Sequence, residues 1–294
     1  MKSTNTSRRL LAALLVIFAL LFLFSVVMFL REFIPLQQDI IKNGQRGEPV
    51  LELQQGIDRG DGHGAVQPTD PNEGYDEAAA KAALLAHYKT LWEENNDMAG
   101  WIYIADTAVN YPVMWTPDLP DKYLRRAFDG SYSISGTPFL GEGWTPESNY
   151  ALILGHHMRN GQMFGSLSQY ASPGYAAEHP IICFDTVDRL EEYTFVAAFY
   201  SQIYDASAEN VFRYYAYTDL SDPAVFAEYV SQVKSVALYD TGVDIVYGDK
   251  ILALSTCNYH TDNGRFVVIA RRAADDHDIS ADDVGSENDP SGGA

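Results

Sequence analysis

The amino-acid sequence predicts a mostly β domain that folds as a closed or nearly closed β-barrel and carries a few helices. Short apolar runs bounded by turn residues follow one another from Trp101 onward, whereas helical spacing occurs in few places. Apolar residues make up 47% of the 294-residue chain, which is enough for a sizeable core. Many short strands with few helices are typical of small barrels.

The chain begins with a segment that can span a membrane. Leu10–Leu30 contains no charged residue, proline or glycine, and as a helix it would be about 30 Å long, the thickness of a bilayer core. A cleaved signal peptide has a shorter apolar run and a small-residue cleavage site, and no such site follows Leu30. We therefore expect an uncleaved signal-anchor at 10–30.

The basic residues around this segment predict its orientation. Lys2, Arg8 and Arg9 precede it, and only Arg31 follows closely. The positive-inside bias then leaves residues 1–9 in the cytoplasm and places the rest of the chain outside the cell membrane.

Two segments have the composition of flexible chain. Residues 31–75 combine glycine, proline and aspartate without periodicity and are expected to form a flexible stalk. Residues 273–294 are acidic and rich in glycine and serine, which predicts a disordered tail. The folded domain is thus expected to span 76–272.

Two helices are expected in this domain. The first covers Asp76–Asn95, where Leu84, Tyr88, Leu91 and Trp92 share one face. The second covers 222–236. Its start is marked by Asp222 as a cap and Pro223 in the first turn, and its apolar face comprises Phe226, Tyr229, Val230 and Val233.

The expected strands lie around and between these helices. They are Trp101–Ile104, Tyr111–Met114, Tyr150–Leu154, Ile181–Phe184, Tyr193–Phe199, Lys250–Thr256 and Arg265–Arg271.

Charge and cysteine content exclude some classes of protein. The formal net charge of −20 argues against binding to a nucleic-acid backbone. Two cysteines are too few for a disulfide framework, although two can still pair outside the cell. The apolar neighbours of Cys183 predict a buried thiol.

Three reactive side chains lie at the ends of predicted strands. Cys257 follows the run 251–256, Arg265 opens the next strand after a short polar loop, and His156 follows the strand that ends at Leu154. A cysteine, a histidine and an arginine so placed can share one cleft, which suggests catalysis by a thiol nucleophile.

Several motifs resemble those of class B sortases. Ala253-Leu254-Ser255-Thr256-Cys257 resembles the family's T-L-x-T-C signature, Gly155-His156-His157-Met158 its histidine context, and Arg265 its arginine position. Further similarity lies in Asn160–Leu167, Gly100–Ile104, Tyr111–Val113, Lys122–Leu124 and the helix before the cysteine strand, so that the resemblance covers about 76–272. Departures are Ala253 in place of threonine and an eight-residue step from Cys257 to Arg265.

The resemblance implies a sortase-type closed β-barrel with an N-terminal helix and a helix inserted before the cysteine strand. It also implies a membrane-anchored cysteine transpeptidase with Cys257 as nucleophile, His156 as acid and base, and Arg265 as donor to the oxyanion or to substrate carbonyls. One or both of Ser255 and Thr256 would line the substrate site, and His157 would lie at the edge of the active-site cleft.

The implied substrates are surface proteins with a C-terminal sorting signal, and the acceptor is an amine of peptidoglycan or of a pilin in a Gram-positive envelope. Relatives in class B serve haem and iron uptake or pilus assembly. The visible residues require no metal or other cofactor.

Two alternatives stay open at this point. Cys257, His260 and His156 could form a zinc site of an envelope hydrolase, although such a site usually has four ligands. The chain could also be a non-catalytic envelope tether. Asp262 could orient a histidine, although a loop aspartate is more often solvated.

Overall fold

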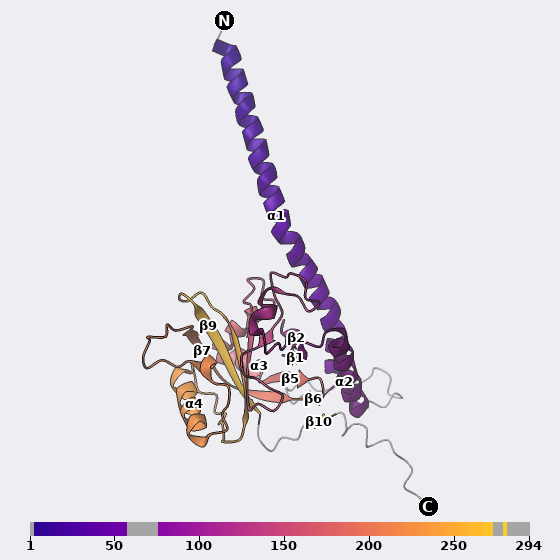
Figure 1. Cartoon of the computed structure of the whole chain (residues 1–294), viewed down its shortest axis with the longest axis vertical. Coiled ribbons are helices and arrows are strands. Elements are labelled where there is room, and N and C mark those ends of the chain that lie inside the picture. Colours follow the sequence, from indigo (N-terminus) through magenta and orange to yellow (C-terminus); the bar gives the residue numbers. More distant parts are fainter. Residues whose placement is uncertain (1–2, 58–75, 273–278, 281–294) are drawn as a thin grey trace, which may run out of the picture.

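The computed structural model describes residues 3–57, 76–272 and 279–280, and its centre is a closed eight-stranded barrel. The strand order is β1-β2-β3-β4-β8-β9-β7-β5, and pairing of β1 with β5 closes the ring. Most pairs are antiparallel, but β2 runs parallel to β3 and β4 runs parallel to β8. Figure 1 shows this barrel with α2 (Glu77–Glu94) and the end of α1 (Ser3–Gln55) on one side and α4 (Pro223–Val236) on the other.

The observed strands match the expected ones, with ends that differ by up to three residues. The barrel strands are β1 (Met98–Tyr103), β2 (Asn110–Met114), β3 (Phe139–Leu140), β4 (Tyr150–Gly155), β5 (Ile181–Thr186), β7 (Glu192–Gln202), β8 (Lys250–Cys257) and β9 (Gly264–Arg272). The short strands β3 and β6 (Arg189–Leu190) were not expected, because two residues give no periodicity.

Alternation along the strands separates two cores. On β8, Leu252 and Leu254 point into the barrel, whereas Ile251 and Ala253 point outward into a second cluster beneath α4. This outer cluster also holds aromatic rings from the segment between β7 and α4, including Phe212 and Tyr214. The strands are therefore buried on both faces, which explains their nearly continuous apolar sequence.

The two expected helices of the domain are present. Helix α2 (Glu77–Glu94) is capped by the Asp76 side chain, and α4 (Pro223–Val236) by that of Asp222. The apolar faces of both helices pack on the domain. At the margin of the α2 face, Trp92 stays 39% exposed. The remaining helical turns are η1 (Pro120–Arg125), η2 (Gly165–Ala171), α3 (Pro173–Glu178) and η3 (Tyr214–Ala216).

The expectation of a flexible stalk is wrong over residues 31–57. Helix α1 runs from Ser3 to Gln55 without interruption, through prolines at 35 and 49 that disfavour a helix by propensity alone. Tertiary packing offsets this cost, because Val50 and Ile57 are buried against the domain formed by 76–272. The rest of the expected stalk, 58–75, lies outside the described residues.

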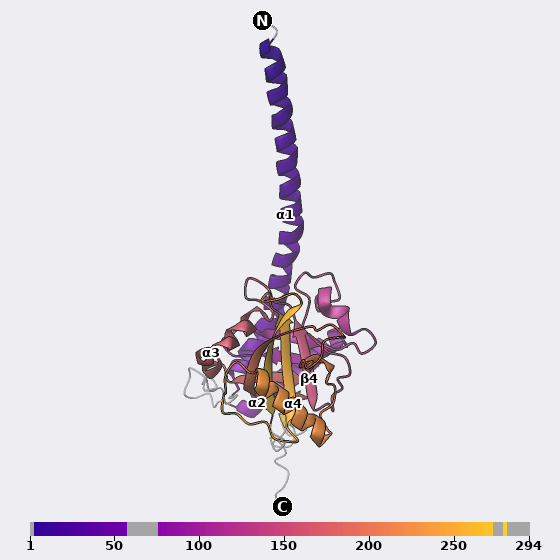
Figure 2. The same ribbon diagram turned by 90° about the vertical axis from the view of Figure 1, so that its left-hand side faces the viewer.

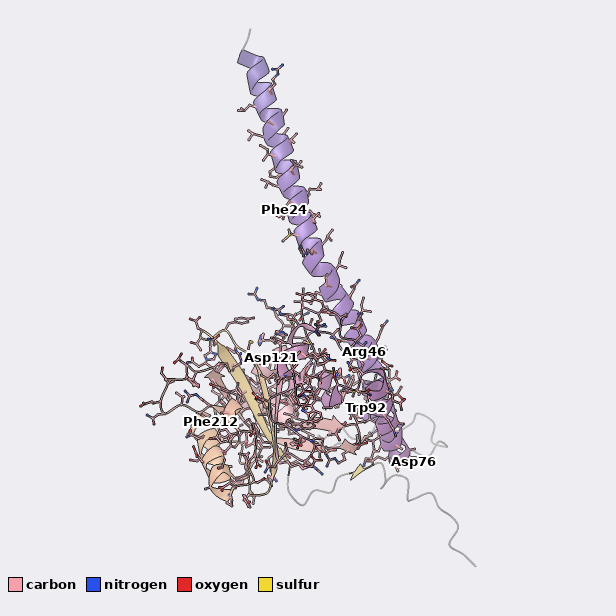
Figure 3. All side chains as sticks on the ribbon, in the orientation of Figure 1. Phe24, Arg46, Asp76, Trp92, Asp121 and Phe212 are labelled. Atoms are coloured by element: carbon pink, nitrogen blue, oxygen red, sulfur yellow. The ribbon has the colours of Figure 1, made fainter. Side chains whose placement is uncertain are left out.

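The N-terminal part of α1 projects from the barrel, as Figures 1 and 2 show. Its apolar stretch is long enough to cross a membrane, and none of it is buried in the structure. Phe24, labelled in Figure 3, lies on this projecting part. The tail expected at 273–294 lies outside the described residues except for β10 (Ile279–Ser280), which pairs with β6.

Candidate active site

Strand pairing brings the three predicted site residues to one end of the barrel. Cys257 is the last residue of β8 and lies directly opposite Arg265 on β9. On the other side of β8, Thr256 lies opposite Gly155 at the end of β4, and His156 follows Gly155. Cys257 therefore has the histidine strand on one side and the arginine strand on the other.

All three positions lie on the same face of the sheet. Cys257 continues the outward series of Ile251 and Ala253, and Arg265 continues that of Val267 and Ile269. On β4 the outward residues are Tyr150 and Leu152, and the same alternation reaches His156. The shared face is the outer one, above the cluster beneath α4.

The next residue, His157, belongs to a different environment. It forms an isolated β-bridge with Met163, and its ring lies 6.0 Å from that of Tyr259. Its Nδ1 is buried without a hydrogen-bond partner among the described residues. The choice of His156 over His157 as the site histidine thus agrees with strand alternation.

A backbone carbonyl orients His156. The Nε2 atom lies 2.7 Å from the Leu124 carbonyl oxygen at the end of η1. Because a carbonyl only accepts, the imidazole carries a proton on Nε2, and in the neutral ring Nδ1 is the free base. η1 itself is anchored by an ion pair between Lys122 and Asp97.

Burial lowers the pKa of His156 below its usual value of 6.5. The Leu124 carbonyl partly opposes this shift, and the positive charge of Arg125 adds to it. The neutral imidazole is therefore the main form at neutral pH, ready to accept a proton.

Ser255 and Thr256 are both 1% exposed, and their hydroxyls are engaged inside the protein. Thr256 Oγ1 donates to the Gly155 carbonyl at 2.8 Å and ties the ends of β8 and β4 together. Ser255 Oγ lies 2.8 Å from the Tyr214 hydroxyl. The structure therefore does not support substrate contact by these two side chains and favours a positioning role for them.

Tyr214 is a site residue that the sequence did not reveal. Burial raises its pKa to about 12, and the charges of Arg265 and Cys257 act on its hydroxyl in opposite directions. It comes from η3, 41 residues before its partner Ser255, so no local pattern links the two. The carbonyl of Leu124 was missed for a similar reason: every residue has a backbone carbonyl, so its use as an acceptor is not visible in a sequence motif.

The short step between Cys257 and Arg265 forms a compact turn. The Asn258 amide donates to the Gly264 carbonyl at 2.9 Å, and the Gly264 amide donates to the Thr261 carbonyl at 3.1 Å. A Cβ on Gly264 would lie 2.2 Å from the Asn258 carbonyl oxygen, so only glycine fits there. The Arg265 guanidinium is half-buried beside this turn and donates to the Gly264 carbonyl at 3.0 Å.

The structure does not favour the zinc site of Cys257, His260 and His156. His260 is exposed. Its Nδ1 forms a hydrogen bond of 3.0 Å with Asn258 Oδ1, and its ring centre lies 5.1 Å from that of Tyr200. Across 3–57, 76–272 and 279–280, no group of three His, Cys, Asp or Glu residues could hold a metal ion. Asp262 is exposed on the same turn. Cys183 is buried in β5, and no disulfide joins it to Cys257.

Comparison with known proteins finds relatives of one kind, although no family model matches the chain. It is 28% identical over 184 residues to sortase B of Listeria monocytogenes and 27% identical over 188 residues to sortase B of Staphylococcus aureus. These matches cover 61% and 63% of this chain and 71% and 73% of the relatives.

Solved structures show the same fold. Sortase B of Bacillus anthracis in complex with AAEK1 is 28% identical and superposes with a TM-score of 0.54 over 63% of this chain and 83% of that one. A sortase B complexed with triglycine has a TM-score of 0.61 at 20% identity and covers 80% and 97%.

The barrel and these relatives define a cysteine transpeptidase of the sortase type. Within that class, the similarities in sequence and structure support a class B sortase.

Proposed function

We propose that this sortase is anchored in the cell membrane by α1 and attaches secreted proteins to the cell envelope outside it. It would cleave a sorting signal near the C-terminus of such a protein and transfer the new acyl end to an amine of peptidoglycan or of a pilin. The apolar run 10–30 and the basic residues before it support the anchoring and its orientation.

In the proposed first step the sulfur of Cys257 attacks the peptide carbonyl carbon of the signal. His156 Nδ1 takes the thiol proton and then gives it to the leaving amine as the carbon–nitrogen bond breaks. A thioester on Cys257 results. The Leu124 carbonyl supports this role, because it holds the proton of the neutral ring on Nε2 and leaves Nδ1 basic.

In the second step an incoming amine attacks the thioester carbon and His156 takes its surplus proton. The carbon–sulfur bond then breaks and the thiolate of Cys257 is released. Triglycine is the ligand of one sortase B structure, so an oligoglycine amine is the first acceptor to test.

Arg265 is the proposed donor to the negative oxygen that develops in both steps. It lies directly across from Cys257, remains charged at any physiological pH, and presents a planar fork of donors. In the free enzyme its guanidinium donates to the Gly264 carbonyl. Binding of substrate would replace this contact with one to the oxyanion.

The observation that carries the proposal is the alignment of three strand ends on one face of the barrel. The test is peptide turnover by the full chain in detergent, with candidate sorting peptides and an oligoglycine acceptor. We expect loss of all turnover in Cys257→Ala and His156→Ala, and a loss of about 100-fold or more in Arg265→Gln, as for other oxyanion donors. Equal turnover in Cys257→Ala would reject the proposal.

The same variants address the alternatives. A non-catalytic tether would still hold its partners at the cell surface after Cys257→Ala. A zinc hydrolase would lose activity when the metal is removed by a chelator, whereas the proposed thiol mechanism predicts unchanged turnover.

A further inference from the structure

Helix α1 is bound to the catalytic domain from Asp39 to Gln54. Asp39 accepts a hydrogen bond from Ser133 Oγ at 2.6 Å, the Gly47 carbonyl accepts one from Asn110 at 2.9 Å, and Gln54 donates to Asp185 at 3.0 Å. These contacts span residues 39–54, about 23 Å of helix. Over this length the helix therefore packs against the domain and is not a free tether.

The direction of α1 places the active-site end of the barrel toward the apolar run. Asn43 contacts Met163, which forms a β-bridge with His157 beside the site. Farther from the membrane segment, Gln54 contacts Asp185 at the opposite end of the barrel. In Figure 1 the start of β9, where Arg265 lies, is accordingly at the end from which α1 projects.

The surface around this end carries exposed arginines and tyrosines. We define the rim as Arg125, Arg126, Tyr132, Arg159 and Tyr259, all of which are exposed. Tyr132 is 66% exposed and Tyr259 is 74% exposed.

Contacts with residues already described place the rim at the active-site end of the barrel. Arg126 pairs with Tyr132 in a bridge, and Asp129 between them binds Lys42 of α1 at 2.8 Å. Arg159 lies in the turn between His157 and Met163, and the Tyr259 ring packs on His157.

The charge of the rim is opposite to that of the whole chain. The protein has a formal net charge of −20, yet three arginines gather at this end. Of the acidic residues nearest to them along the chain, Asp129 is paired with Lys42, whereas Asp121 and Asp262 are exposed. Arginine with tyrosine is the composition of surfaces that lie at lipid headgroups.

The length of helix between the apolar run and the barrel is short. Phe33 and Ile34 are still exposed and apolar, and Asp39 is the first buried residue of the described helix after them. The nine residues from Leu30 to Asp39 correspond to about 13.5 Å of helix, of which about 5–7 Å would lie within the headgroup layer. Arginine side chains at this height reach charged headgroups within a Debye length of about 8 Å.

We propose that the rim is a membrane-docking surface that binds anionic lipid headgroups of the membrane in which α1 is anchored. The inference rests on the proposed anchoring. It implies that the active site opens next to the lipid surface and accepts peptide signals and amines presented there.

The test is hydrogen–deuterium exchange of the full chain in nanodiscs of phosphatidylcholine, alone or with phosphatidylglycerol. We expect slower exchange of 126–132 and 157–163 in the anionic nanodiscs, and loss of this protection in high salt. The double variant Arg126→Gln with Arg159→Gln should lose most of it, because each cation near an anionic surface contributes about fivefold in binding. The matched control is Lys89→Gln with Lys234→Gln, which removes two positive charges from α2 and α4.

Equal exchange in both lipids, or equal protection in the double variant, would overturn the inference. Cys257→Ala should retain the lipid-dependent protection although it lacks peptide turnover, so a failure of the proposed chemistry is seen separately. A chain that does not copurify with nanodiscs would overturn the anchoring and this docking surface together.

Discussion

At the level of single residues, the Leu124 carbonyl determines which nitrogen of His156 is basic. No carboxylate performs this task in the part of the chain that the structure describes; the hydrogen bond of 2.7 Å comes from η1. A neutral acceptor orients the ring without stabilising its charged form as strongly as a carboxylate would. This agrees with the lowered pKa of His156.

The lowered pKa gives a prediction with a definite sign. Below pH 6.5 the unfolded chain binds a proton at this histidine more readily than the folded one, so stability should fall as the pH decreases through this range. NMR titration of His156 in Cys257→Ala should give a pKa below 6.5. A value above 6.5 would contradict the burial and the charge environment described above.

A second residue-level prediction concerns Tyr214. Tyr214→Phe leaves the Ser255 hydroxyl buried without its partner, which should lower the free energy of unfolding by about 1–3 kcal/mol. Chemical denaturation measures this loss. Tyr217→Phe, a neighbouring tyrosine outside this hydrogen bond, is the control and should change stability less. Equal losses would show that the hydrogen bond between Tyr214 and Ser255 does not contribute to the free energy of unfolding.

At the level of elements, the end of β4, where Gly155 pairs with Thr256 of β8, depends on a glycine. A Cβ on Gly155 would lie 2.6 Å from the Phe164 ring, and His156 is the next residue. Gly155→Ala should therefore cost about 1–3 kcal/mol of stability and also lower kcat by moving the imidazole. Gly174→Ala, where the nearest atom would be 3.7 Å from the Cβ, is the control and should leave kcat unchanged. An unchanged kcat in Gly155→Ala would contradict the proposed role of this strand end.

The strands and the two domain helices could be predicted because their signals are local. Alternating and continuous apolar runs, the Asp76 and Asp222 caps, and the motif around Cys257 are all visible within a short window. The partners of the site residues could not be predicted in this way. Tyr214 and Leu124 reach the site from distant segments that carry no motif of their own.

For helix α1 the sequence predicts a flexible stalk, whereas the structure has a helix. Its glycines and prolines argue for a flexible segment, and propensity alone would be right for an isolated peptide. The helix persists because one of its faces packs on the domain, with Val50 fully buried and Asp39 and Gln54 nearly so. Such packing is visible only once the barrel that provides the opposing surface is known.

At the level of the whole molecule, α1 joins the membrane segment to the barrel through a buried polar network. Gln54 Nε2 and the Tyr88 hydroxyl both donate to Asp185, which is fully buried. Arg46, labelled in Figure 3, lies on the same docked part of the helix. Its guanidinium lies 4.7 Å from the centre of the Phe128 ring.

This network predicts that the helix stabilises the catalytic domain. Gln54→Ala removes one donor to a buried carboxylate and should lower the free energy of unfolding by about 1–3 kcal/mol. Gln55→Ala, an adjacent residue of the same type that is exposed, should have little effect. Thermal or urea denaturation of the full chain in detergent compares the two. Equal behaviour would mean that α1 is not docked in solution.

The central claim is that Cys257, His156 and Arg265 act as one site for transpeptidation. Intact-mass spectrometry of the full chain with a cognate sorting peptide tests it most directly. We predict an acyl adduct on Cys257 that forms slowly or not at all in His156→Ala and Arg265→Gln, and that an amine acceptor discharges faster than water does. An adduct on Cys183, or turnover without any adduct, would contradict the claim.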